Sequence, residues 1–170
     1  PNYKAHRDVA PAHFFQDLEQ LQEILKTQLQ LPLCLAPGFE ADDVLGTLAN
    51  RAAADGWGVR ILSGDRDLFQ LVDDKRDIKV AYLAKGISAH DLVDLKFIAD
   101  KYSIPGERYA LFATFRGDPS DGLPGVRGIG EKGAAVIANN FATAEDALQG
   151  ALAADPSLPP ALAKKIIAGA

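Results

Sequence analysis

The 170 residues are enough for one domain, or for one domain with a small appendage. With 48% hydrophobic and 24% charged residues, the composition favours a folded chain with an ordinary core over a disordered one. No apolar run approaches the roughly 18 residues of a transmembrane helix, and the sequence as given opens with no secretory leader. The single cysteine, Cys34, excludes an internal disulfide framework and a multi-cysteine zinc site. We therefore expect a cytoplasmic protein with no membrane partner.

The net charge of −5 does not exclude a polyanionic partner, because the acidic residues are concentrated. Seven of the 23 acidic residues fall within three short segments, Glu40–Asp43, Asp65–Asp67 and Asp118–Asp121. Nucleic acid therefore stays among the partners that the composition allows.

Hydrophobic periodicity and turn residues predict alternating helices and strands in the first two thirds of the chain. We expect helices over residues 11–31, 39–54, 68–72, 88–102 and 105–115, and buried strands over residues 33–35, 59–62 and 78–83. The first strand would place Cys34 in the core. Ser88 is expected to cap the fourth of these helices, and Pro105 to open the fifth.

Short strands that alternate with helices predict a parallel sheet covered on both faces, with ligands gathered beyond the carboxyl ends of the strands. After Arg116 the composition changes to a glycine-rich stretch over residues 117–133. Helical patterns follow, over residues 131–141, 144–153 and 160–168. We therefore divide the chain into an α/β part, residues 1–116, and a small helical module, residues 117–170.

Two of the acidic segments follow predicted strands. Glu40, Asp42 and Asp43 open a helix after one strand, and Asp65 and Asp67 follow the next. Taken singly, such residues are ordinary helix-terminus or turn residues. A parallel sheet would bring both groups to one edge, where carboxylates about 4 Å apart repel by about 4 kcal/mol at an effective dielectric constant of roughly 20. A hard divalent cation, Mg²⁺ or Mn²⁺, would remove this repulsion, so the residues alone leave caps and metal ligands as alternatives.

The glycine-rich segment 122–132 leads directly into a predicted helix. Glycines at 125, 128 and 130 permit positive φ and a close approach of another backbone. Exposed amides at the start of a helix bind phosphate oxygens, and Lys132 adds positive charge. The spacing matches neither a Walker loop nor a dinucleotide fingerprint. The segment resembles the helix-hairpin-helix clamp for the backbone of duplex DNA, with a purely structural loop as the alternative.

Five sequence blocks in order resemble the 5′ nuclease family, and above all the 5′–3′ exonuclease domain of bacterial DNA polymerase I and the free-standing flap endonucleases. The blocks are Tyr3–Arg7, Gly38–Thr47, Ser63–Leu68, Gly117–Asp121 and Leu123–Lys132. The resemblance implies an α/β, PIN-like nuclease core with a parallel sheet flanked by helices over residues 1–116, with a remnant of a helical arch. It also implies a helix-three-turn-helix (helix-hairpin-helix) DNA-binding module over residues 117–170.

The resemblance further implies a set of site residues. Two divalent ions, Mg²⁺ or Mn²⁺, would be held directly or through water by Glu40, Asp42, Asp43, Asp65, Asp67, Asp118 and Asp121. Lys4 and Arg7 would act with Asp67 as catalytic residues at the scissile phosphate. DNA would be contacted by Tyr3, Lys4, Arg7, Gly125, Arg127, Gly128, Gly130 and Lys132. A potassium ion would bridge the hairpin to a DNA phosphate.

The implied activity is that of a structure-specific 5′–3′ exonuclease or flap endonuclease in replication and repair, acting on DNA at a 5′ flap, a nick or a 5′ end. We expect a monomer associated with the nucleoid that is fused to, or works with, a DNA polymerase. The family's first strand and two upstream acidic ligands are not in this sequence, so we interpret it as truncated at both ends. That departure favours one alternative, a catalytically impaired reader of DNA structure. A PIN-type ribonuclease is the other.

Overall fold

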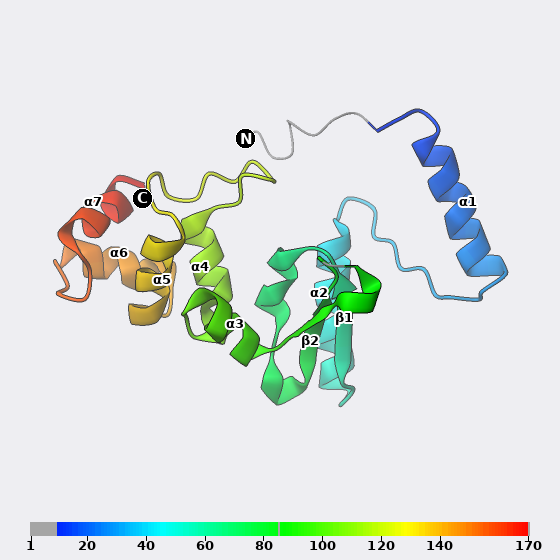
Figure 1. Cartoon of the computed structure of the whole chain (residues 1–170), viewed down its shortest axis with the longest axis horizontal. Helices are drawn as coiled ribbons and strands as arrows, with labels where there is room; N and C mark the ends of the chain where they lie inside the picture. The colour runs from blue at the N-terminus through cyan, green and yellow to red at the C-terminus, as the bar shows by residue number, and fades with distance from the viewer. Residues whose placement is uncertain (1–9, 85, 170) are drawn as a thin grey trace.

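The computed structural model describes residues 10–84 and 86–169 (Figure 1). Its helices are α1 (Phe14–Thr27), α2 (Ala41–Ala54), α3 (Leu95–Tyr102), α4 (Tyr109–Arg116), α5 (Glu131–Asn140), α6 (Ala144–Leu152) and α7 (Pro160–Gly169). Its strands are β1 (Val59–Ser63), β2 (Ile78–Tyr82) and β3 (Asp91–Val93). Short 3₁₀ turns intervene as η1 (Arg66–Leu71), η2 (Asp74–Arg76), η3 (Ile87–Ala89) and η4 (Gly106–Arg108). Within the described ranges, no helix has both the length and the apolar character to cross a bilayer.

The sheet is small and mixed, with the strand order β1-β2-β3. β1 and β2 run parallel, with Val59 opposite Ile78, as the sequence predicts. β3 runs antiparallel to β2, with Val93 opposite Val80, so the prediction of a wholly parallel sheet is wrong for this strand. The error comes from residues 88–102, which we expected to form one helix. They instead contain the end of η3, then β3, and only then α3, because the helix cap is Asp94 rather than Ser88.

The start of α3 gives a direct test of this correction. The carboxylate of Asp94 accepts a hydrogen bond of 2.7 Å from the amide of Phe97. Asp94→Ala should therefore lower the free energy of unfolding by about 1 kcal/mol, the usual cost of a lost N-cap. Ser88→Ala should change it by less than about 0.5 kcal/mol, as for an ordinary surface substitution. Urea unfolding of both variants checks this expectation, and a larger loss for Ser88→Ala would contradict the observed start of α3.

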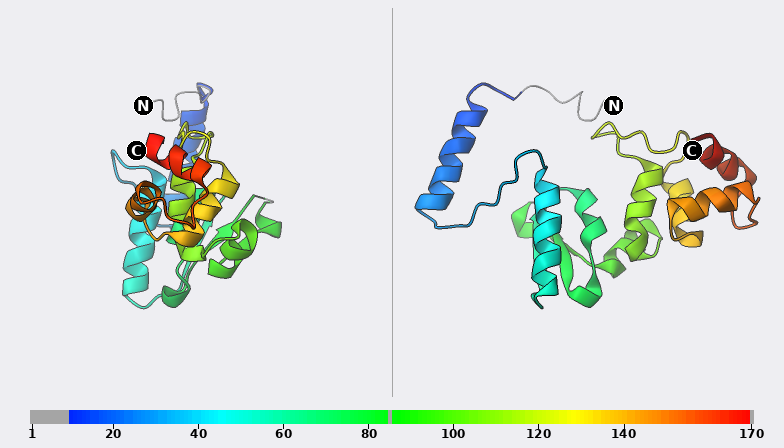
Figure 2. Two further views of the ribbon diagram at one scale, coloured as in Figure 1. Left: turned by 90° about the vertical axis from the view of Figure 1, so that its left-hand side faces the viewer. Right: turned by 180° about the vertical axis from the view of Figure 1, so that it is seen from behind.

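The buried side chains of the sheet, η1 and the later helices form one continuous core. At its centre, the ring of Phe69 packs edge-on against Tyr82 and Phe97 and tilted against Tyr109. α4 carries this core onward, because it packs against both η1 and α5 and its Phe112 is buried (Figure 2). The core thus crosses the predicted boundary at residue 116, and the division into two domains stays a prediction.

α1 and the segment after it stand apart from this core, as Figures 1 and 2 both show. The helix has the predicted apolar stripe, but none of its residues is buried by the part of the chain that the structure describes. Phe14 and Leu21 are 47% and 50% exposed. Residues 33–35 belong to no strand in the described chain, and Cys34 is exposed, so both predictions for this segment are wrong. A short apolar run becomes a strand only where another strand pairs with it.

Candidate functional site

Four of the seven predicted metal ligands line one open cavity of about 310 Å³. Asp65 and Asp67 come from the turn after β1 and from the start of η1, while Asp118 and Asp121 come from the loop after α4. Tyr82, the last residue of β2, borders the same cavity. The four carboxylates therefore border one cavity beyond the carboxyl ends of the two parallel strands, where the topology predicts a ligand site.

Local backbone contacts fix the first of these two segments. The hydroxyl of Ser63 accepts a hydrogen bond of 3.0 Å from the amide of Asp65. The carboxylate of Asp65 in turn accepts one of 2.9 Å from the amide of Asp67 and so caps η1. The capping interpretation is therefore right for Asp65, and this cap places Asp67 at the cavity.

The second segment is a closed loop that buries its acidic residues. Asp118 and Leu123 exchange two backbone hydrogen bonds, of 2.8 Å and 2.9 Å. Asp118 and Asp121 are both buried. One carboxylate oxygen of Asp118, Oδ1, accepts hydrogen bonds from the amide and the hydroxyl of Ser120. The other, Oδ2, accepts a bond of 2.8 Å from Nη2 of Arg66 and lies 3.7 Å from Nη2 of Arg116.

Two of the four carboxylates in the cavity, those of Asp118 and Asp67, have opposite electrostatic surroundings. Burial would raise the pKa of Asp118, but hydrogen bonds from Ser120 and Arg66 outweigh it and hold that pKa at about 2. Burial raises the pKa of Asp67, and the charges of Asp65 and Asp118 raise it further. The surroundings of Asp67 therefore disfavour its negative charge. A cation bound nearby would stabilise that charge.

The first acidic segment lies elsewhere. Of the described residues, Glu40, Asp42 and Asp43 lie outside the lining of this cavity. Glu40 caps α2, and its amide donates a hydrogen bond of 3.0 Å to the carboxylate of Asp43, so these two form a capping box. Residues 33–35, which we expected to lead into this helix as a strand, form no strand in the described chain.

Within residues 10–84 and 86–169, no three histidine, cysteine or acidic side chains are close enough together to hold a metal ion. The structure therefore brings four of the seven predicted ligands to one cavity without assembling a finished site. The assignment of all seven as ligands stays a prediction. Tyr3, Lys4 and Arg7, predicted to contact DNA, lie outside the described residues.

The predicted phosphate-binding hairpin is open to solvent. Arg127, Gly128, Gly130 and Lys132 are all exposed, and Gly130 is the N-cap of α5. The carbonyl oxygen of Gly128 accepts a hydrogen bond of 2.6 Å from Nζ of Lys165 on α7. The first amides of α5 and two cationic side chains therefore lie on one accessible stretch of chain, as a phosphate-binding segment requires.

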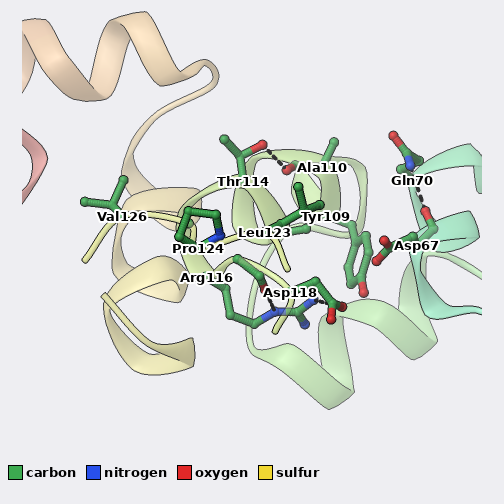
Figure 3. Close-up of a pocket in the computed structure, with 13 residues that line it drawn as sticks. Asp67, Gln70, Tyr109, Ala110, Thr114, Arg116, Asp118, Leu123, Pro124 and Val126 are labelled. Carbon is green, nitrogen blue, oxygen red and sulfur yellow. Dashed lines mark hydrogen bonds and ion pairs between the residues drawn. The ribbon is translucent and has the colours of Figure 1, made fainter. Parts of the chain in front are cut away.

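A second cavity, of about 520 Å³, adjoins the first and shares Asp67 and Asp118 with it (Figure 3). Arg116 forms part of its wall, and its side chain is only 7% exposed. Nε of Arg116 donates to the carbonyl oxygen of Gly117 at 3.0 Å, and the guanidinium lies 5.2 Å from the ring centroid of Phe112. This arginine is therefore fixed beside Asp118.

The sequence analysis missed both arginines that contact Asp118. The available signal was their position, since Arg66 stands between Asp65 and Asp67, and Arg116 shortly precedes Asp118. Cations interleaved with predicted metal ligands indicate that the same side chains neutralise those carboxylates in the folded protein.

A sequence model of the N-terminal, resolvase-like domain of 5′–3′ exonucleases matches residues 1–103. The chain belongs to this family. The matched residues include Asp65, Arg66 and Asp67 and end before the loop that carries Asp118.

Curated relatives agree with this membership. A 5′–3′ exonuclease of Streptomyces coelicolor is 44% identical over 151 residues, which are 83% of this chain and 49% of the relative. One of Mycobacterium tuberculosis is 45% identical over 153 residues, covering 81% of this chain and 48% of the relative. A DNA polymerase I of the same species is 42% identical over 135 residues, covering 79% of this chain and 15% of the polymerase. The chain thus spans about half the length of the two exonucleases.

Solved structures share the fold. A mutant of the T5 5′-exonuclease superposes with a TM-score of 0.71 at 21% identity, over 91% of this chain and 59% of that one. A bacteriophage T5 flap endonuclease, described as a pseudo-enzyme–product complex with DNA and metal ions, gives a TM-score of 0.70 at 20% identity, over 99% of this chain and 62% of that one. The small mixed sheet flanked by helices therefore matches part of the fold of the T5 5′-exonuclease.

Proposed function

We propose that this chain is the nuclease part of a structure-specific 5′–3′ exonuclease or flap endonuclease, which hydrolyses phosphodiester bonds of DNA with the help of two divalent metal ions. The observation that carries the proposal is the cavity at the carboxyl edge of the sheet, where four carboxylates meet from segments about 50 residues apart along the chain. Membership of the 5′–3′ exonuclease family supports the reaction, and the T5 complex with DNA and metal ions supports the kind of substrate and cofactor.

The donor set fits a hard divalent cation. The cavity presents carboxylate oxygens rather than imidazole or thiolate groups, which suits Mg²⁺ or Mn²⁺. The raised pKa of Asp67 points to the same need for positive charge. Asp65, Asp67, Asp118 and Asp121 are the residues that would hold the first ion, and the segment Glu40–Asp43 stays a candidate for the second. Bound ions of this kind activate a water molecule and neutralise phosphate charge.

The chain's other residues have positioning roles in this proposal. Ser120 holds the carboxylate of Asp118 in one orientation, and Nη2 of Arg116 adds a positive charge 3.7 Å from it. Arg127 and Lys132, with the first amides of α5, grip phosphates of the duplex and set the distance to the cleavage site. Lys4 and Arg7 stabilise charge at the scissile phosphate.

The proposed biological setting is replication and repair, in the cytoplasm and at the nucleoid. The relatedness to DNA polymerase I supports a link to a polymerase, either fused or separate. A potassium ion at the hairpin and a monomeric state belong to the same proposal.

The experiment is cleavage of a labelled 5′-flap DNA by the 170-residue chain. We expect release of short 5′ products with Mg²⁺ and none when EDTA is in excess, because the carboxylates need the metal to act on phosphate. A nicked duplex and a matched RNA flap run beside it. Cleavage of the RNA alone would identify a ribonuclease instead.

A second candidate, an impaired reader of DNA structure, is favoured by one observation. The described acidic side chains do not form a finished metal site. Tight binding of the flap DNA without cleavage at any Mg²⁺ or Mn²⁺ concentration would support this candidate and overturn the nuclease proposal.

A further inference from the structure

Both oxygens of the Asp118 carboxylate are already occupied by groups of the protein. Oδ1 accepts hydrogen bonds from the amide and the hydroxyl of Ser120, the first at 2.9 Å. Oδ2 accepts a bond of 2.8 Å from Nη2 of Arg66. Arg66 itself lines the cavity and stands in sequence between Asp65 and Asp67. A cation that approaches Oδ2 therefore meets another cation already there.

The two arginines beside Asp118 differ in how easily their side chains can move away from its carboxylate. The side chain of Arg66 is 37% exposed, so its guanidinium can turn into water without losing hydration. The side chain of Arg116 is 7% exposed and is bonded to the carbonyl of Gly117. Moving Arg116 would break this bond and open the packed wall of the second cavity, whereas moving Arg66 breaks one ion pair.

We propose that Arg66 is a built-in counter-cation that occupies Asp118 in the metal-free protein and competes with the divalent ion for the same carboxylate oxygen. The inference rests on the proposed metal-dependent function. It adds an explanation of how the site is stabilised before a metal ion binds. The charges of Asp65 and Asp118 both oppose the charge of Asp67, and the guanidinium at Asp118 reduces this repulsion before a metal ion is bound. The incoming ion displaces Arg66 into solvent, while Ser120 keeps the carboxylate in place.

This competition determines whether replacing Arg66 strengthens or weakens the binding of a divalent ion. Arg66→Gln removes the competing charge and makes the cavity more negative, so it should bind a divalent ion more tightly. Breaking one partly exposed ion pair corresponds to a gain in affinity of up to about fivefold. A residue that merely supported the bound ion would give the opposite sign, because its loss would weaken metal binding.

The test is a titration of the full chain with Mn²⁺, followed by electron paramagnetic resonance of the free ion. The matched control is Arg60→Gln, since Arg60 also pairs through Nη2 with an aspartate, Asp77, at 2.8 Å and is 41% exposed, but does not line the cavity. We expect tighter Mn²⁺ binding for Arg66→Gln and wild-type binding for Arg60→Gln. The metal-free Arg66→Gln protein should also melt at a lower temperature than wild type, and saturating Mn²⁺ should narrow this difference.

Unchanged or weaker Mn²⁺ binding by a folded Arg66→Gln protein, with wild type binding Mn²⁺ and cleaving DNA, would overturn this inference and leave the proposed function standing. A wild-type chain that takes up no Mn²⁺ would overturn both. If Arg66→Gln does not fold, the Arg66→Lys variant decides, because its more compact charge cannot reproduce the arginine geometry. It should bind Mn²⁺ more tightly than wild type, and weaker binding would overturn the inference.

Discussion

Asp67→Asn is expected to reduce metal-dependent cleavage of 5′-flap DNA by at least about 100-fold while leaving DNA binding unchanged. Loss of a residue that only orients a metal ligand already costs about 10- to 100-fold, and Asp67 is proposed to be a ligand itself. The hairpin and α5, which would grip the duplex, lie on a different stretch of the chain. Cleavage rates at saturating Mg²⁺, together with a fluorescence-anisotropy binding curve in Ca²⁺, measure the two effects separately.

The same substitution should make the metal-free protein slightly more stable. The pKa of Asp67 is raised in the folded state by burial and by Asp65 and Asp118. The folded protein therefore binds a proton at this site more tightly than the unfolded chain does, and stability is lost as the pH rises through the raised pKa. Asparagine resembles the protonated form and carries no charge at any pH. We expect an increase in melting temperature on the order of 2 °C at pH 7 in EDTA, and little difference from wild type at a pH below the ordinary aspartate pKa.

Asp100→Asn is the matched control for this variant. Asp100 lies exposed on α3, where it pairs with Lys96 rather than with the cavity, so the same chemical change should alter neither cleavage nor DNA binding. If Asp67→Asn lost cleavage, DNA binding and thermal stability together, the cause would be misfolding, and the proposed role of Asp67 would be wrong.

The helices were predictable because their signals are local. Residues 41–54 and 131–140 show apolar periodicity and end at turn residues, and the structure confirms both helices within about two residues. The strands show the opposite case. Residues 91–93 contain an aspartate and are too short to show alternation, but they pair with β2. Residues 33–35 are wholly apolar and pair with nothing in the described chain. Strand formation depends on a partner elsewhere, which a local pattern does not contain.

The site residues also fall into those that the sequence predicted and those that it did not. The sequence predicted Asp65 and Asp67 beyond a parallel strand, because topology alone places them at that edge. It predicted Glu40 there as well, on the basis of a strand that does not form. The pairing of Arg66 with Asp118 joins residues 52 positions apart. Such a contact depends on the packing of α4 against η1. The place of Arg66 between Asp65 and Asp67 indicates a neutralising role, but it does not indicate that Asp118 is the partner.

Gly125→Ala is expected to destabilise the folded protein by about 2 to 5 kcal/mol and to disturb the loop that presents Asp118. Gly125 has φ of +57°, in the left-handed region, which costs an alanine about 1 to 2 kcal/mol. An added Cβ would lie 2.5 Å from the amide nitrogen of Gly117 and 2.7 Å from its Cα. These are backbone atoms directly before Asp118 and cannot turn aside as a side chain can, so overpacking adds about 1 to 3 kcal/mol.

Alanine substitutions at two other glycines separate the conformational cost from the cost of overpacking. Gly56 has φ of +84°, and among the described residues nothing lies within 4 Å of an added Cβ, so Gly56→Ala carries the conformational cost alone. Gly64 has neither a positive φ nor a close neighbour of that kind, so Gly64→Ala should leave stability nearly unchanged. Urea unfolding should rank the losses of unfolding free energy as Gly125→Ala above Gly56→Ala above Gly64→Ala. Mn²⁺ binding should weaken for Gly125→Ala and not for Gly56→Ala, whose glycine does not line the cavity. Equal losses for Gly125→Ala and Gly56→Ala would mean that the contact with Gly117 is not what excludes a side chain. The expected ranking would instead give Gly125, predicted as a phosphate-binding glycine, a structural role in holding Asp118 at the cavity.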